Sequence, residues 1–193
     1  MPRTTRPGGR TARTKAAVFE AAAALVAERG PEAVAMTDIA RRAGVAATSL
    51  YRRWGDVRAL LLEVAVEKLV ADSPLPDTGS LRSDLRVWAR RVAAGLRAPG
   101  GSPFFRIMLA NAPTPGDGDI GRATAFGPRL QQIATMLDRA AARGETVPPL
   151  MDVIDHLLAP IYMRTLFGAP IGAAFAHDLA DRLCGPARGD SQI

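Results

Sequence analysis

The stretch MTDIARRAGVAATSLYRRWGDVRALL, residues 36–61, decides the fold of this chain. Its pattern predicts a short helix, a glycine turn, a second short helix and the start of a long apolar helix. Thr37 is a suitable N-cap for the first helix, because its hydroxyl can accept a hydrogen bond from a free amide of the next turn. Gly44 stands where that helix must end, since glycine adopts left-handed dihedrals at no steric cost. Such a helix–turn–helix can place its second helix in the major groove of DNA.

The second helix of this stretch has two different faces. The side chains expected to face inward recur at i, i+3, i+4 and i+7: Ala47, Leu50, Tyr51 and Trp54. Those expected to face outward are polar or basic: Thr48, Ser49, Arg52 and Arg53. Two amphipathic helices of an ordinary all-helical domain would also give this pattern, but the outer face carries no acidic residue, which favours a polyanionic partner.

The excess positive charge lies in the first third of the chain. Residues 1–60 carry 11 Lys and Arg against 5 Asp and Glu, whereas residues 61–193 carry 14 of each. The first ten residues, MPRTTRPGGR, are predicted to form a flexible basic arm, in which Arg3, Arg6 and Arg10 would contact phosphates or the minor groove. This charge distribution suits DNA, whose binding becomes salt-dependent as phosphates are neutralised.

Composition argues against several other classes of protein. The single cysteine, Cys184, excludes an internal disulfide framework and a multi-cysteine zinc site, and suits a cytoplasmic protein. No stretch reaches the roughly 18 apolar residues that span a bilayer. His156 and His177 are the only histidines, and no nucleophile motif or phosphate-binding loop occurs. We therefore expect no enzyme, metal, cofactor or membrane partner.

The helical periodicity predicts four parts. They are the arm (1–10), a DNA-binding domain (11–72, with the motif at about 37–56), a C-terminal domain (73–185) and a tail (186–193). Asp56 can cap a helix that continues to about residue 72 and is apolar on most sides, so it should be covered by both domains and link them. Further helices are expected over 81–97, 104–112, 119–143, 149–167 and 172–184.

The motif contains Gly44-Val45, Leu50-Tyr51, an aromatic residue at Trp54, and Ala59-Leu60-Leu61 in this order and spacing. In these residues it resembles the TetR-type transcriptional regulators, the TetR/AcrR family. This resemblance implies an all-α fold, in which a three-helix helix–turn–helix domain is joined by a long helix to a helical ligand-binding and dimerisation domain. Two positions depart from the family pattern: Val57 replaces the usual lysine, and Ala46 replaces the serine that caps the recognition helix.

The resemblance also implies roles for individual residues. Thr37 corresponds to a phosphate contact, Ala47, Thr48 and Arg52 to base-edge contacts, and Ser49, Tyr51 and Arg53 to contacts with the DNA backbone. Arg52 could equally bind guanine or a phosphate. Whether Arg58 substitutes for the lysine missing at Val57 is left open.

The C-terminal domain of such regulators binds a small molecule and pairs with a second copy. Candidate pocket residues, for which core packing is the alternative, are Trp88, Phe104, Phe105, Met108, Phe126, Met136 and Tyr162. Candidate dimer residues, which would be core in a monomer, are Leu150, Val153, Ile154, Leu157, Leu158, Ile161, Phe175, Leu179 and Leu183.

The sequence therefore predicts a homodimeric repressor that binds a palindromic operator and is released by a small-molecule ligand. Two alternatives stay open at this point. One is a constitutive DNA-binding protein with a packed C-terminal core. The other is an all-helical enzyme or interaction module whose basic N-terminus meets an acidic protein.

Overall fold

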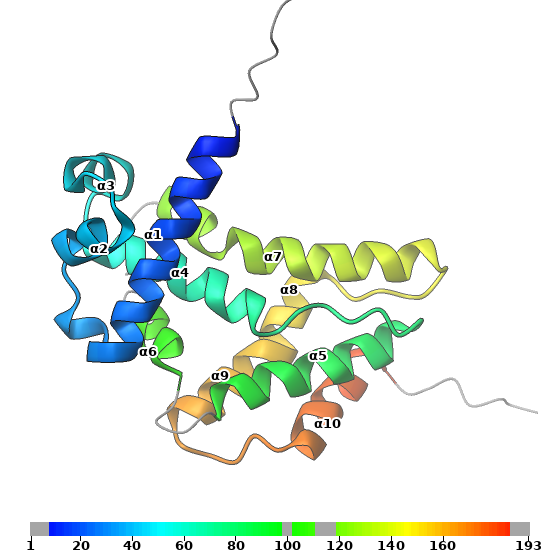
Figure 1. Ribbon diagram of the computed structural model, residues 1–193. Helices are drawn as coiled ribbons and strands as arrows, with labels where there is room; N and C mark the ends of the chain where they lie inside the picture. The colour runs from blue at the N-terminus through cyan, green and yellow to red at the C-terminus, as the bar shows by residue number, and fades with distance from the viewer. Residues whose placement is uncertain (1–7, 98–101, 111–118, 186–193) are drawn as a thin grey trace, which may run out of the picture. The chain divides into compact units, whose positions relative to one another are not determined.

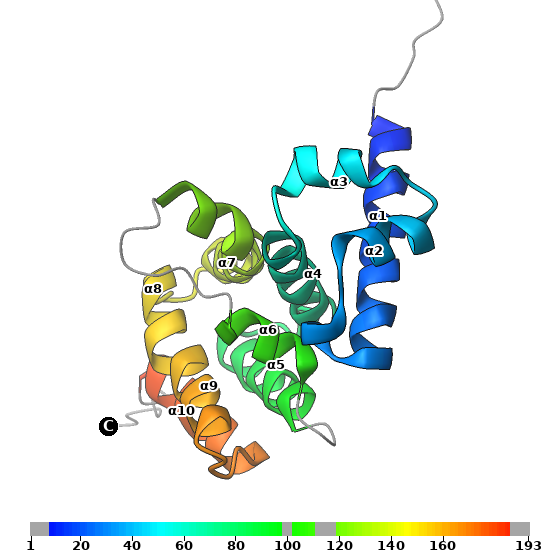
Figure 2. The same ribbon diagram turned by 90° about the vertical axis from the view of Figure 1, so that its left-hand side faces the viewer.

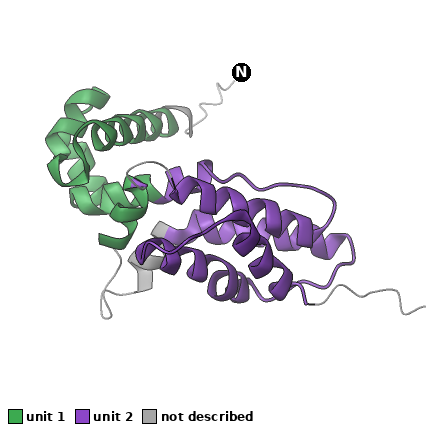
Figure 3. Cartoon of the chain, turned by 90° about the horizontal axis from the view of Figure 1, so that it is seen from below, with its two compact units in different colours: residues 1–65, 103–114 green, residues 66–102, 115–193 purple. Residues whose placement is uncertain are grey.

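The computed structural model describes residues 8–97, 102–110 and 119–185, and its regular secondary structure there is entirely helical (Figure 1). The all-α prediction is therefore confirmed. The chain forms two compact units, residues 1–65 with 103–114 (unit 1) and residues 66–102 with 115–193 (unit 2) (Figure 3). Their division falls inside helix α4 (Val57–Ala71), which thus contributes residues to both units. No helix in the described ranges is long and apolar enough to cross a membrane.

Unit 1 is built around the apolar faces of five helices. They are α1 (Gly8–Arg29), α2 (Met36–Ala43), α3 (Ala47–Trp54), the start of α4, and α6 (Pro103–Ala110), with a short 3-10 turn, η1 (Pro31–Ala33). Val18, Ile39 and Leu60 are fully buried in its core, and Ile107 of α6 joins them. Within this unit α3 and α6 lie at opposite ends (Figures 1 and 2).

Two helices of unit 1 begin earlier than the sequence predicts. Helix α1 starts at Gly8, so Arg10 belongs to a helix and not to the arm, while Arg3 and Arg6 lie outside the described residues. Helix α2 starts at Met36 behind Ala35, which provides no side-chain cap, so the prediction of Thr37 as the N-cap is wrong. The Met36 side chain is 2% exposed and packs in the core of unit 1. Because this packing fixes the Met36 backbone, the helix begins at Met36 and Thr37 lies within its first turn.

Unit 2 contains α5 (Leu81–Leu96), α7 (Asp119–Ala142), α8 (Leu150–Val153), η2 (Ile154–Leu158), α9 (Ala159–Leu166) and α10 (Ala173–Leu183). α5 and α10 pack along each other, and Asp181 joins them by accepting hydrogen bonds from Arg82 at 3.0 Å and Arg86 at 2.7 Å. The hydrogen bonds from Arg86, followed by those from Arg82, lower the pKa of Asp181.

The helix predicted over residues 149–167 has an irregular centre. Its middle segment, η2, is a π-helix in which the Ala159 amide donates to the Ile154 carbonyl five residues back. Pro160 follows immediately and has no N–H to continue the regular α-helical ladder, which accounts for the local change of register.

A buried carboxylate fixes the start of α5. Asp84 is fully buried and accepts hydrogen bonds from the Thr78 amide at 2.7 Å and the Thr78 hydroxyl at 2.8 Å. Ser80 is the N-cap, and its hydroxyl accepts a hydrogen bond from the Ser83 amide. The Ser80 contact satisfies one of the amides that a helix start leaves unpaired, and the Asp84 contacts hold Thr78, which precedes the cap, against the first turn of the helix.

Candidate nucleic-acid interface

The turn between α2 and α3 is a glycine C-cap. Gly44 has φ 67° and ψ 32°, the left-handed region that favours glycine. The Val45 amide donates to the Ala40 carbonyl at 3.0 Å and the Gly44 amide to the Arg41 carbonyl at 3.4 Å, which is the Schellman pattern. Val45 packs on the core of unit 1, so the turn sets the angle at which α3 leaves α2.

Helix α3 rests on the core along a narrow stripe. Leu50 is buried, and Ala47 and Trp54 are partly buried against the same core. The predicted inward position of Tyr51 is wrong, because its side chain lies beside this stripe and is 49% exposed. The four residues predicted to face outward are all exposed, as expected: Thr48, Ser49, Arg52 and Arg53. The ring of Tyr51 therefore adds to the exposed face.

The ion pairs of unit 1 separate its arginines into two groups. On α2, Arg41 pairs with Asp38 at 2.6 Å and Arg42 with Glu28 at 2.6 Å, and the Arg42 hydrogen bonds lower the pKa of Glu28. On α3 and the start of α4, by contrast, no described carboxylate lies within 4 Å of Arg52, Arg53 or Arg58. The available positive charge is thus on α3 and not on α2.

A partly buried cluster ties α3 to α1 and α4. The Trp54 indole N–H donates to Glu63 at 2.6 Å, and Lys15 pairs with the same carboxylate at 2.8 Å. Burial raises the pKa of Glu63, but the hydrogen bonds from Lys15 and Trp54 outweigh it, so the net shift is downward. The guanidinium of Arg53 lies over the Trp54 ring, 4.8 Å from its centroid. The sequence analysis did not predict this cluster. The feature that could have indicated it is Glu63, an acidic residue within an otherwise apolar stretch of α4.

The start of α4 also follows from its residues. The Asp56 carboxylate accepts a hydrogen bond from the Ala59 amide at 2.9 Å, which confirms the predicted cap. Val57 is half-buried. Arg58 is exposed and lines a groove of about 410 Å³ together with Glu32 of η1 and Arg106 of α6. Because that groove extends to α6, Arg58 is less well placed than Arg52 to belong to the exposed face of α3.

The candidate pocket residues are divided between the two units. Phe104, Phe105 and Met108 belong to α6 in unit 1, where Phe105 and Met108 are buried. Trp88 and Met136 are buried in unit 2, and Phe126 is half-buried. Tyr162 lines a small cavity in unit 2. The structure thus brings Tyr162, and not the full predicted set, to one described cavity.

The candidate dimer residues are largely covered within a single chain. The buried members of the set are Val153, Leu157, Leu158, Ile161 and Leu179, and the partly buried ones are Leu150, Ile154, Phe175 and Leu183. The same helical segment exposes another set of large apolar side chains: Met151, Met163, Leu166 and Phe167, the last of which is 75% exposed.

The comparisons with known proteins agree with this architecture. The family model for bacterial regulatory proteins of the tetR family matches residues 18–64, and the tetracyclin repressor-like C-terminal domain matches residues 75–183. The transcriptional regulator AqdR of Rhodococcus erythropolis is 35% identical over 136 residues, which cover 70% of this chain and 65% of that protein. YdeS of Bacillus subtilis, also described as an HTH-type transcriptional regulator, is 28% identical over 169 residues, 86% of this chain and 85% of that protein.

A solved structure shows the same fold over most of the chain. The TetR family transcription regulator SCO0332 superposes with a TM-score of 0.72 at 26% identity, covering 89% of this chain and 97% of that one. The fold and the exposed basic α3 define a helix–turn–helix regulator of transcription. The chain belongs to the TetR family, with an N-terminal helix–turn–helix domain and a tetracyclin repressor-like C-terminal domain.

Proposed function

We propose that this regulator is a homodimeric repressor that binds a palindromic operator in the cytoplasm and is released by a small molecule. The observation that carries the DNA-binding part is the exposed face of α3. It presents Arg52, Arg53 and Tyr51 without a described carboxylate within 4 Å of either arginine, while the α2 arginines are already paired. Cations that are not paired within the protein are available to phosphates and base edges.

We propose a role in DNA binding for each residue of the exposed face of α3, and for several residues outside it. Arg52 binds the O6 and N7 atoms of a guanine, and Ala47 and Thr48 contact neighbouring base edges. Ser49, Tyr51 and Arg53 hold phosphates. Thr37, exposed in the first turn of α2, donates to a phosphate together with the amides that the helix start leaves unpaired. Arg3, Arg6 and Arg10 add phosphate or minor-groove contacts, and Arg58 contributes less than Arg52.

Dimerisation is proposed through the segment α8–η2–α9 and helix α10. Its support is the exposed apolar side chains of Met151, Met163, Leu166 and Phe167, which would contact water in a monomer. The buried members of the predicted set would position these side chains and not meet the second copy directly. A two-fold dimer matches an operator whose half-sites are about 34–36 Å apart.

Selection of bound sequences from a random DNA pool tests the proposal. We expect a palindrome with half-sites one helical turn apart. On the selected operator, Arg52→Ala should weaken binding by about fivefold to hundredfold and relax the sequence preference at one position of each half-site. Arg41→Ala is the matched control, because Arg41 is equally an exposed arginine but is paired with Asp38. Equal effects of the two variants would contradict the assignment of α3 as the reading helix.

One observation favours a second candidate, a constitutive DNA-binding protein. The cavity that Tyr162 lines encloses about 10 Å³, which is room for a single water molecule. A repressor that no small molecule releases from its operator would have this property. The two candidates differ in whether any compound that stabilises unit 2 also lowers operator affinity, since ligand and DNA must weaken each other's binding by the same factor.

A further inference from the structure

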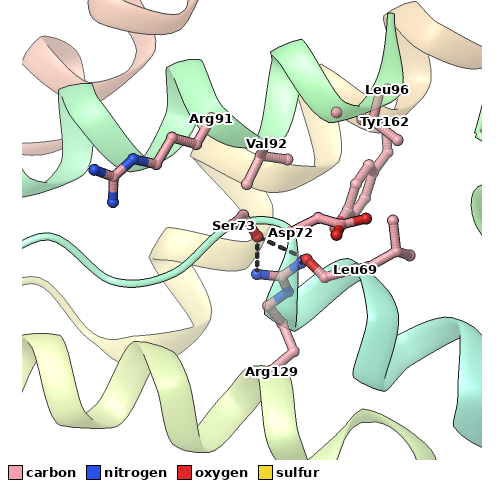
Figure 4. Close-up of a pocket in the computed structure, with 9 residues that line it drawn as sticks. Leu69, Asp72, Ser73, Arg91, Val92, Leu96, Arg129 and Tyr162 are labelled. Carbon is pink, nitrogen blue, oxygen red and sulfur yellow. Dashed lines mark hydrogen bonds between the residues drawn. The ribbon is translucent and has the colours of Figure 1, made fainter. Parts of the chain in front are cut away.

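A small cavity of unit 2 contains the buried side chain of Arg129, which belongs to α7 and contacts the end of α4. Arg129 is 6% exposed and donates hydrogen bonds to the Leu69 carbonyl at 2.9 Å and the Ser73 hydroxyl at 2.9 Å (Figure 4). It also donates to the Gln132 amide oxygen at 2.6 Å. Its guanidinium also lies 5.4 Å from the centroid of the Trp88 ring. These contacts place a cation against the last carbonyls of α4, which the helix itself leaves unpaired.

The charge of Arg129 has no described carboxylate partner. Among the residues that the structure describes, no Asp or Glu oxygen lies within 4 Å of it, and Asp72, which also lines the cavity, is exposed and pairs with Lys68 at 3.0 Å. Burial lowers the pKa of Arg129 and raises the pKa of Tyr162 beside it, yet an arginine stays charged in proteins. A buried cation that only neutral acceptors and a helix end compensate is costly, and an anion would remove much of that cost.

The walls of the cavity indicate the kind of molecule that would carry the anion. Leu69, Val92 and Leu96 supply apolar surface, and Tyr162 supplies an aromatic ring with a hydroxyl. Arg91 lines the cavity too, but its guanidinium donates to the Pro74 carbonyl at 2.8 Å. One buried cation among apolar walls suits an organic monoanion better than a phosphate dianion.

We propose that this cavity receives the carboxylate of a small organic acid, which forms a bidentate pair with Arg129. This inference rests on the proposed function, in which the C-terminal domain binds an effector. Because the space is about 10 Å³, any occupant larger than water displaces part of the wall. The carboxylate takes over the donors that Arg129 now gives to Leu69 and Ser73. Binding therefore removes two of the hydrogen bonds between α7 and the end of α4, while Gln132 of α7 keeps its hydrogen bond to the Ser73 carbonyl.

The alternative role for Arg129 is purely structural, as a cap on the end of α4. A cation at a helix C-terminus stabilises the helix and needs no ligand. The two roles differ in one readout. A cap gives the protein no preference between an acid and its neutral analogue, whereas a carboxylate receptor does.

Matched pairs of acids and amides provide that readout with the full chain. The probes are benzoate with benzamide, 2-naphthoate with 2-naphthamide, and decanoate with decanamide, measured by calorimetric titration and by the shift of the unfolding temperature at pH 7.5. We expect at least one acid to bind about tenfold or more tightly than its amide, because the hydrogen bonds to the guanidinium become charge-assisted. Arg129→Gln should remove this preference, and Arg90→Gln, which changes an exposed arginine on α5, should keep it.

Each outcome decides the proposal. Equal binding of acid and amide in the natural protein, or no binding of any acid, overturns it even if Arg129→Gln does not fold. A preference that survives in folded Arg129→Gln also overturns it. Operator affinity separates this inference from the proposed function. An acid that binds through Arg129 but leaves operator affinity unchanged supports the carboxylate site and contradicts ligand release, whereas release by neutral molecules alone supports ligand release and contradicts the carboxylate site.

Discussion

Glu63→Gln should destabilise the protein while leaving the shape of the side chain almost unchanged. The substitution removes the ion pair with Lys15. The two side chains are 32% and 28% exposed, and a partly exposed pair of this kind contributes about 0.5–1 kcal/mol. It also converts the charge-assisted hydrogen bond from Trp54 into a neutral one, a loss of about 1 kcal/mol. We expect the free energy of unfolding to fall by about 1–2 kcal/mol at pH 7, measured by urea unfolding monitored by circular dichroism.

The pH dependence of this loss has a defined sign. The folded state lowers the pKa of Glu63, so its contribution is complete above the unfolded pKa and disappears as the pH falls through the folded pKa. The difference between the natural protein and Glu63→Gln should therefore shrink as the pH is lowered from 7 to about 3.5.

A double-mutant cycle with Trp54→Phe identifies the cause. If the indole hydrogen bond is responsible, the two substitutions together should destabilise the protein by about 1 kcal/mol less than the sum of the single effects. Glu20→Gln, which neutralises an exposed residue on α1, is the control and should have a smaller effect. Strictly additive effects, or a loss that is independent of pH, would refute the argument that this carboxylate couples α3 to α1 and α4.

Three further substitutions test the local geometry. Gly44→Ala should lower the free energy of unfolding by about 1 kcal/mol because of the positive φ alone, since an added Cβ meets nothing within 4 Å. Gly95→Ala in α5 should stabilise the protein in the same urea assay, because alanine favours a helix more than glycine does. Asp84→Asn should lower the free energy of unfolding by about 2–3 kcal/mol, because a buried hydrogen-bond acceptor loses its charge. Asp138→Asn, which changes an exposed residue, is the control and should leave the unfolding temperature almost unchanged. Asp56→Ala should cost about 1 kcal/mol, and Asp56→Ser, which keeps a capping hydroxyl, should recover most of it in chemical unfolding.

Much of the fold could be predicted from the sequence because its signals are local. Helical periodicity, Gly44 and Asp56 each determine a backbone choice within a few residues, and the structure confirms the turn and the cap at these positions. Signals that depend on distant residues were less informative. Met36 begins α2 because the core buries its side chain, and α6 joins unit 1 because Ile107 packs on residues far away in the sequence.

The candidate site shows the same limit. The outward positions of Thr48, Ser49, Arg52 and Arg53 follow from the 3.6-residue period, and all four are exposed. Tyr51 differs because the period places it near the boundary of the buried stripe, where packing decides on which side the ring lies. Which arginines are paired could not be predicted either, since Glu28 meets Arg42 only after α1 and α2 have packed.

Both ends of α4 are capped, but from different sources. At its start the cap is Asp56, one residue before the helix, and it was therefore visible in the sequence. At its end the Leu69 carbonyl accepts one hydrogen bond from the nearby Ser73 hydroxyl at 2.7 Å and another from Arg129 of α7, 60 residues further on. A local cap persists whatever the rest of the chain does, whereas the distant cap exists only while α7 keeps its place. The hydrogen bond from Arg129 is thus the part of this cap that a bound molecule can remove, while the one from Ser73 stays.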